Sequence, residues 1–217
     1  MVEVESKILV SEVSKVPALT VNAIQKAALS QKTTEAALSV IPQPSLAAEI
    51  LSPANATLIR NFNPAQYNPE VIDIDKLSQA VEMFGQTKGA MGQNGPLKQV
   101  LINGKMGTDT KISLKGPMYE LEKAIELANR GEIIIEFGQK IQSREFDIIT
   151  ETKVIECKNW DWDKIGIDQL AKLKSTLPNL NRIAASKGKK FEFYSRNQIP
   201  LSLKKWLHEK NITFFEG

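Results

Sequence analysis

Three charged side chains on two neighbouring apolar segments have the types and the spacing to hold a metal ion against a phosphate. Asp147 lies in the apolar run 146–150, Glu156 lies in the next run, 154–157, and Lys158 follows directly after it. Because side chains alternate along a strand, Glu156 and Lys158 share one face. Carboxylate oxygens are hard ligands that suit Mg²⁺ or Mn²⁺, and a nearby ammonium can orient a water or neutralise charge on a phosphate. Lys158 is the residue expected to orient the attacking water or, as a neutral amine, to deprotonate it. The pattern predicts phosphodiester hydrolysis.

The two runs are joined by a short polar connection, Glu151-Thr152. Two apolar runs separated in this way are typical of a β-hairpin. We therefore expect the hairpin to bring Asp147 alongside Glu156. The alternative is an ordinary solvent-exposed sheet face, on which Glu156 and Lys158 form a surface ion pair that contributes little to stability.

These segments resemble the PD-(D/E)XK nuclease superfamily, whose core carries Glu on a helix, Asp on a strand, Glu-x-Lys on the next strand and often Gln on a following helix. A helix is expected from Pro117 to Arg130, closed by Gly131. This segment is similar to that of Holliday-junction resolvases, and the similarity implies Glu120 as the helix carboxylate. The resemblance also implies Gln169 as the helix Gln.

The resemblance implies a full set of site residues. The catalytic set is Glu120, Asp147, Glu156, Lys158 and Gln169. The implied ligands of Mg²⁺ or Mn²⁺ are the carboxylates of Glu120, Asp147 and Glu156 and the backbone carbonyl of Cys157.

The element pattern from Lys111 onward is α/β. After the Pro117 helix come strands at 133–135, 146–150 and 154–157, a helix that begins near Asp168 and that Pro178 is expected to end, a strand at 191–194, a helix at 201–209 and a strand at 212–215. This order predicts a central mixed sheet flanked by helices, which matches a restriction-endonuclease-like core. Residues 111–217 are thus the expected nuclease domain.

The first half of the chain, residues 1–110, is predicted to be mostly helical. Apolar residues recur at helical spacing within 21–41, and residues 74–84 form another expected helix that Gly85 ends. The Gly-rich segment at about 85–107 resembles a linker.

Charge is distributed unevenly. Residues 164–217 hold eleven Lys or Arg against four acids, a net of +7, whereas residues 111–163 hold eight against eleven, a net of −3. A basic region beside an acidic, cation-requiring cluster suits a polyanion such as DNA or RNA. The expected nucleic-acid contacts are Lys172, Lys187, Lys189 and Lys190. Lys-rich surfaces are also commonly just solvated.

Cysteine and histidine usage excludes several classes of site. One Cys, Cys157, leaves no internal disulfide and no Cys-based zinc site, and one His, His208, excludes two-His metal sites and His-pair ribonucleases. The N-terminal residues show no basic region followed by an apolar core, and no apolar run reaches the length of a membrane span. We expect a protein that acts in the cytoplasm.

The layout, a small nuclease-like region behind an Ala- and Ser-rich leader, is similar to the toxic C-terminal domains of bacterial polymorphic and contact-dependent inhibition toxins. That similarity implies delivery within a larger secreted protein and an acidic immunity partner. The alternatives are a restriction, transposition or recombination nuclease acting on DNA, and a catalytically silent nucleic-acid-binding domain of the same fold.

Overall fold

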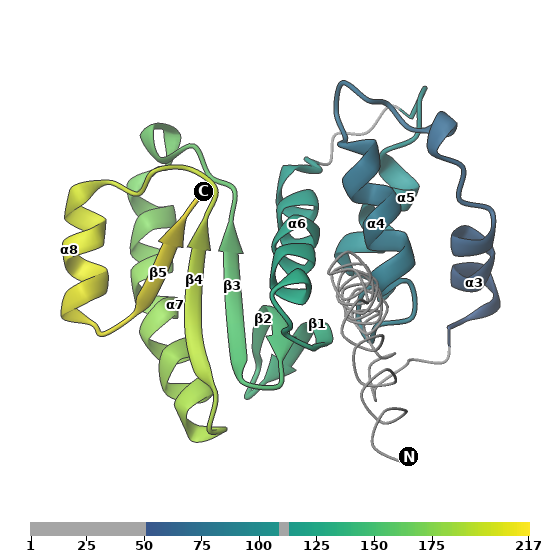
Figure 1. Cartoon of the computed structure of the whole chain (residues 1–217). Helices are drawn as coiled ribbons and strands as arrows, with labels where there is room; N and C mark the ends of the chain where they lie inside the picture. Colours follow the sequence, from purple (N-terminus) through teal and green to yellow (C-terminus); the bar gives the residue numbers. More distant parts are fainter. Residues whose placement is uncertain (1–50, 109–112) are drawn as a thin grey trace, which may run out of the picture. The chain divides into compact units, whose positions relative to one another are not determined.

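Five strands form one mixed sheet in the computed structural model, which describes residues 51–108 and 113–217 (Figure 1). The strands lie side by side in chain order. They are β1 (Ile134–Ile141), β2 (Arg144–Thr150), β3 (Lys153–Lys158), β4 (Lys190–Ser195) and β5 (Thr213–Glu216). The first three strands pair antiparallel, as short turns allow, and β3, β4 and β5 pair parallel through helical crossovers.

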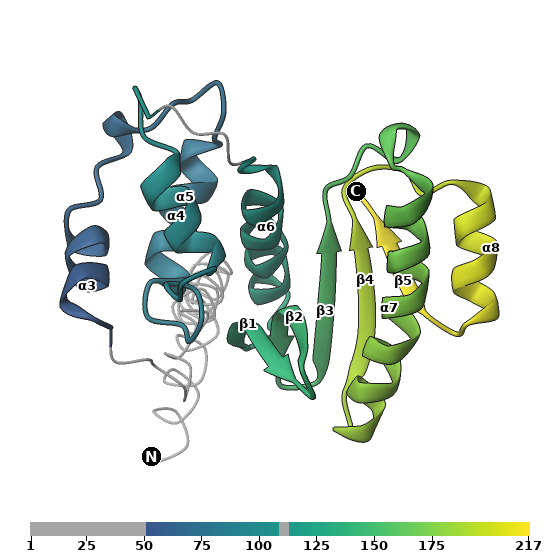
Figure 2. The ribbon, with the colours of Figure 1, turned by 180° about the vertical axis from the view of Figure 1, so that it is seen from behind.

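Helices cover both faces of this sheet (Figure 2). The helices are α6 (Lys115–Asn129), α7 (Ile167–Ser186) and α8 (Leu201–Glu209). Ile155 and Cys157 of β3 are buried with α6 residues, whereas Val154 is buried with residues of α7 and α8. Alternate side chains of β3 thus pack into two different cores, one on each face of the sheet. The α/β class and the mixed sheet flanked by helices are as predicted.

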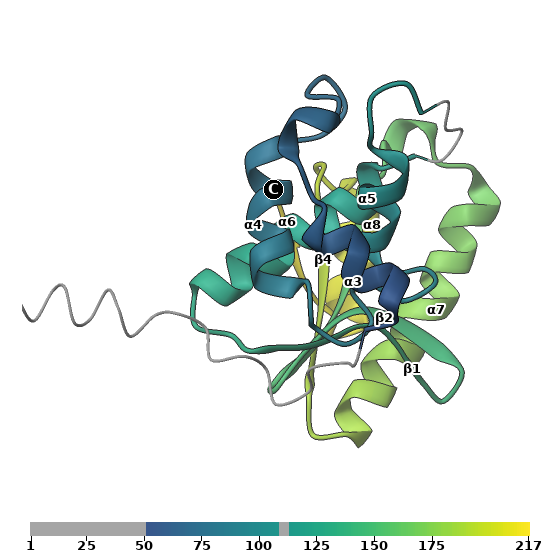
Figure 3. The same cartoon turned by 90° about the vertical axis from the view of Figure 1, so that its right-hand side faces the viewer.

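A second layer of helices packs on α6. It contains α3 (Pro53–Arg60), the 3-10 turn η2 (Pro64–Gln66), α4 (Ile74–Phe84) and α5 (Pro96–Asn103). Leu77 of α4 and Leu101 of α5 are fully buried in the same core as Leu121 of α6. Figure 3 shows α4, α5 and α6 close together. Residues 51–108 therefore share a core with α6 and the sheet.

The Gly-rich segment at 85–107 is packed structure, contrary to the expectation of a linker. It contains α5 and the buried Ala90 and Met91. Its backbone also lies along the edge of β1, where the Phe137 N–H donates to the Lys88 carbonyl over 2.9 Å. The glycines permit this close approach: a Cβ on Gly89 would lie 1.9 Å from the Phe137 carbonyl oxygen.

Two of the predicted helices end at different distances from their expected stop residues. The helix at 74–84 ends at Gly85 as predicted. The prediction that Pro178 ends its helix is wrong, because α7 continues to Ser186 and buries Leu180 and Ile183 beyond the proline. The helix expected within 21–41 lies outside the described residues. Over residues 51–108 and 113–217, every helix is too short or too polar to cross a bilayer.

Candidate active site

The site begins where β2 and β3 separate. The ladder pairs Ile149 with Val154 and Ile148 with Ile155. At the next step the main-chain N–H of Cys157 donates to Oδ2 of Asp147 over 2.7 Å. The Asp147 carboxylate thus accepts the bond from the Cys157 N–H, which faces β2. The carboxylate therefore lies between the two strands.

Lys158 forms ion pairs with both strand carboxylates, those of Asp147 and Glu156. Its Nζ lies 2.5 Å from Oε1 of Glu156 and 3.6 Å from Oδ2 of Asp147. The same ammonium donates to the Cys157 carbonyl over 2.9 Å. The side chains of these three charged residues are all less than one-fifth exposed. The hairpin therefore unites Asp147 and Glu156, as the sequence predicted.

Glu120 of α6 reaches the same charge cluster. Burial raises the pKa of Glu120 well above the usual glutamate range, and the negative charges of Asp147 and Glu156 add to the rise. The Lys158 ammonium opposes it. Four charged groups from α6, β2 and β3 therefore interact, with three carboxylates against one ammonium.

The protonation states follow from burial and charge. Burial, then the charge of Asp147, raises the pKa of Glu156 to about 7. Burial lowers the pKa of Lys158, but the charges of Asp147 and Glu156 outweigh burial and hold that pKa well above the usual lysine range. Lys158 is thus an ammonium at neutral pH, which makes it an electrostatic group and not a ready proton acceptor.

The donor set suits a divalent cation, although the side chains are not gathered around one point. In the described ranges, no three Asp, Glu, His or Cys side chains are arranged to hold a metal ion. The reason lies in Lys158, whose ammonium bonds Glu156, Asp147 and the Cys157 carbonyl, the same oxygens that a cation would use. The hard carboxylate and carbonyl oxygens nevertheless fit Mg²⁺ or Mn²⁺, whose positive charge would favour the ionised form of each carboxyl group.

Cys157 contributes its backbone and not its thiol. The side chain is buried, and burial, then the charge of Asp147, raises the thiol pKa well above its usual value. Cys157 therefore packs as a small buried hydrophobic side chain.

Gln169 does not join the carboxylates. Its side chain is exposed, and its Oε1 accepts the Gly166 N–H over 3.4 Å, so it caps the first turn of α7. No bond from Gln169 to the carboxylate cluster exists in the described structure.

Two of the four expected lysine contacts, Lys189 and Lys190, lie at the other end of β3. Lys190 pairs with Lys153, the first residue of β3, whereas Lys158 is the last. Lys189 donates to the carbonyls of Thr150 and Glu151, so it fastens the loop to the β2–β3 turn. Lys172 and Lys187 are exposed.

Sequence reasoning missed Glu145. Its charge raises the pKa of both Glu120 and Glu156, so it adds to the negative potential of the site. The signal was available: Glu145 precedes Asp147 by two positions and shares its strand face.

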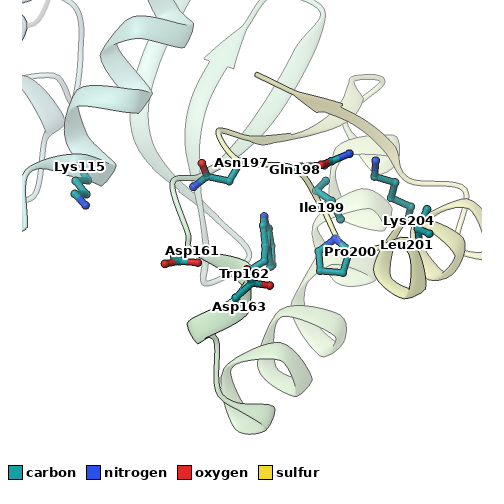
Figure 4. A pocket seen from close by; sticks show the side chains of 10 residues that line it. All are labelled: Lys115, Asp161, Trp162, Asp163, Asn197, Gln198, Ile199, Pro200, Leu201 and Lys204. Atoms are coloured by element: carbon teal, nitrogen blue, oxygen red, sulfur yellow. The ribbon is translucent and has the colours of Figure 1, made fainter.

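A pocket adjoins the site at the ends of β3 and β4. It encloses about 800 Å³ and is lined from α6, the 3-10 turn η3 (Trp162–Lys164), the β4–α8 loop and α8. In Figure 4, Trp162 lies centrally, with Asp161 and Lys115 to one side and Pro200 and Leu201 to the other. Two bonds join it to the site: Asn159 Nδ2 to the Lys115 carbonyl, and Arg196 N–H to the Lys158 carbonyl, both 2.9 Å.

A scan against protein-family models and a search of curated proteins found no match to this chain.

Proposed function

We propose that this protein is a divalent-metal-dependent nuclease that hydrolyses phosphodiester bonds in nucleic acid. The observation that carries the proposal is the contact of Lys158 with Asp147 and Glu156 where β2 and β3 separate, with Glu120 of α6 close enough for its charge to interact with all three. Ordinary surface ion pairs do not explain it, because Lys158 is largely buried and contacts two carboxylates and a backbone carbonyl at once.

Each residue has a role in this proposal. Glu120, Asp147 and Glu156 would hold Mg²⁺ or Mn²⁺, with the Cys157 carbonyl as a further oxygen. Such an ion supplies a polarised water and neutralises phosphate charge. Lys158, as an ammonium, binds a non-bridging phosphate oxygen and stabilises the extra negative charge that forms during attack. The bond from Cys157 N–H to Asp147 fixes the carboxylate before substrate arrives.

The order of elements supports a restriction-endonuclease-like assignment within the proposal. A helix with Glu120 precedes three antiparallel strands, and a crossover helix leads to a strand parallel to the third. The PD-(D/E)XK motif places its helix Glu, strand Asp and Glu-x-Lys on elements in this order. Gln169, exposed and capping its own helix, departs from the motif.

Cleavage assays test the proposal directly. Purified wild type is incubated with plasmid DNA, oligonucleotide DNA and RNA, with Mg²⁺, with Mn²⁺ and with EDTA. We expect metal-dependent cleavage that Asp147→Asn and Lys158→Met abolish and that the exposed control Asp75→Asn retains. Equal cleavage by wild type and both site variants would overturn the proposal.

Two biological settings give different results in a second assay. A toxin arrests growth when it is expressed in the cytoplasm, and Asp147→Asn relieves the arrest. A DNA-processing nuclease cleaves DNA in preference to RNA. A catalytically silent binding domain shifts nucleic acid in gels and cleaves neither substrate.

A further inference from the structure

The pocket beside the carboxylate cluster combines flat apolar walls with free amide groups. Pro200 and Leu201 supply apolar surface beside the Trp162 indole. The Gln198 side chain has no hydrogen-bond partner within the described residues, and the Asn197 Nδ2 donates to the Trp160 carbonyl over 2.8 Å, which leaves its Oδ1 available. Amides offer both donors and acceptors, which suits the edge of a heterocycle.

Trp162 is held rigidly in this pocket. Its Nε1 donates to Oγ of the buried Ser195 over 2.9 Å. Its ring packs edge-on against Trp160 and Phe193, with centroids 5.6 and 6.5 Å away. A fixed ring offers stacking surface without the entropy cost of ordering it.

Four charged side chains line the pocket, and two of them, Lys204 and Asp161, form ion pairs. Lys204 pairs with Glu216 at 2.8 Å, and Asp161 pairs with Lys164 at 2.6 Å. Lys115, the first residue of α6, and Asp163 have no ion-pair partner within 4 Å in the described structure, and their opposite charges leave the lining with no net charge. A neutral ring therefore suits the interior, and a phosphate suits the rim near Lys115 and Lys158.

We propose that the pocket receives one unstacked nucleobase next to the scissile phosphate, so that the substrate is single-stranded nucleic acid or a loop. The inference rests on the proposed nuclease function and names its substrate class. Its volume of about 800 Å³ is ample for a nucleotide. Lys158 and Asp161 are three residues apart, so the chain separates them by at most about 10 Å, the scale of a neighbouring nucleotide. A base stacked within a duplex has no free faces to offer this pocket.

Binding in EDTA tests this inference without cleavage. A short fluorescent single strand and the same sequence as a blunt duplex are titrated with full-length wild type, Gln198→Ala, Leu201→Trp and the control Val71→Trp. Leu201 and Val71 are both exposed, at 83% and 59%, but only Leu201 lines the pocket. We expect the two pocket variants to weaken single-strand binding by roughly tenfold, with duplex binding and the control unchanged. Equal changes for both nucleic acids, or none, would overturn the inference.

A spectroscopic readout separates this inference from the function on which it rests. Addition of the single strand to wild type should shift the indole N–H resonance of Trp162 but not that of Trp206. If the single strand shifts Trp162 but no substrate is cleaved, the pocket stands and the nuclease proposal fails. The opposite result would be cleavage of substrates without a shift of the Trp162 resonance and with binding by both pocket variants equal to that of Val71→Trp. In that case the pocket inference fails and the nuclease proposal stands.

Discussion

The Cys157 main-chain N–H donates a hydrogen bond to the Asp147 carboxylate over 2.7 Å. This bond holds β2 and β3 together and also positions a carboxylate of the candidate site. Asp147→Asn keeps an acceptor for this N–H, whereas Asp147→Ala leaves the N–H without its partner. We expect Asp147→Ala to lower the free energy of unfolding by about 1–3 kcal/mol more than Asp147→Asn. Denaturant unfolding measures stability, and cleavage should be lost in both variants. Equal stabilities would show that the bond contributes little.

The Glu156 carboxyl makes stability depend on pH. Its pKa is raised to about 7 by burial and then by Asp147, so the folded state holds a proton that the unfolded state releases near pH 4.5. In EDTA, the free energy of unfolding should therefore fall as pH rises from about 4.5 through 7, by at most about 3 kcal/mol from this group. Glu156→Gln should flatten the slope, with the remainder due to Glu120. Urea unfolding at several pH values measures it, and an unchanged slope in Glu156→Gln would contradict the assignment.

Much of this arrangement could be predicted from the sequence. Alternating apolar residues and the Glu151-Thr152 turn predicted the hairpin that unites Asp147, Glu156 and Lys158, and the structure confirms it. The Glu120 helix was predicted from helical periodicity and its closing Gly131, where the chain has a φ of +88°.

The errors arise because composition and motif position do not report which contacts a residue makes in the folded chain. Glycines at 89–95 resembled a linker, but they allow backbone to lie against β1 and Ala90. Pro178 resembled a helix end, but burial of Leu177 and Leu180 on either side stabilises a continuous helix. Gln169 matched a motif by position, yet the direction of its side chain depends on the first turn of α7.

Lys158 and a divalent ion should compete for the same oxygens. Lys158→Met removes a buried positive charge beside Asp147 and Glu156, so it should tighten Mn²⁺ binding by about tenfold or more even as it abolishes cleavage. Calorimetric titration of Mn²⁺ measures the affinity, with the exposed Lys210→Met as a control. Weaker Mn²⁺ binding in Lys158→Met would instead show that the ammonium organises the carboxylates for the ion.

Gly89 should be essential to the docking of its segment on β1. Alanine there would place Cβ 1.9 Å from the Phe137 carbonyl oxygen at a φ of +79°. Gly131 has a similar φ of +88° but no atom within 4 Å of such a Cβ, so it is a matched control. We expect Gly131→Ala to cost about 1–2 kcal/mol from the backbone alone and Gly89→Ala to cost about 3 kcal/mol or more. Thermal unfolding compares the two, and equal losses would mean that the Gly89 contact yields easily.

Because Lys187 and Lys190 lie near the far end of β3, we expect their contribution to binding affinity to depend on substrate length. Lys190 pairs with Lys153, five positions before Lys158, which is about 17 Å along the strand. That distance corresponds to about five nucleotides of a helical strand. The double variant Lys187→Gln and Lys190→Gln should therefore weaken binding of substrates that extend further than this from the scissile phosphate and leave shorter ones unaffected. Affinities for a length series, at two salt concentrations, measure the effect. A loss that is the same at every length would place these lysines at the site itself, and no loss at any length would make them an ordinary solvated surface.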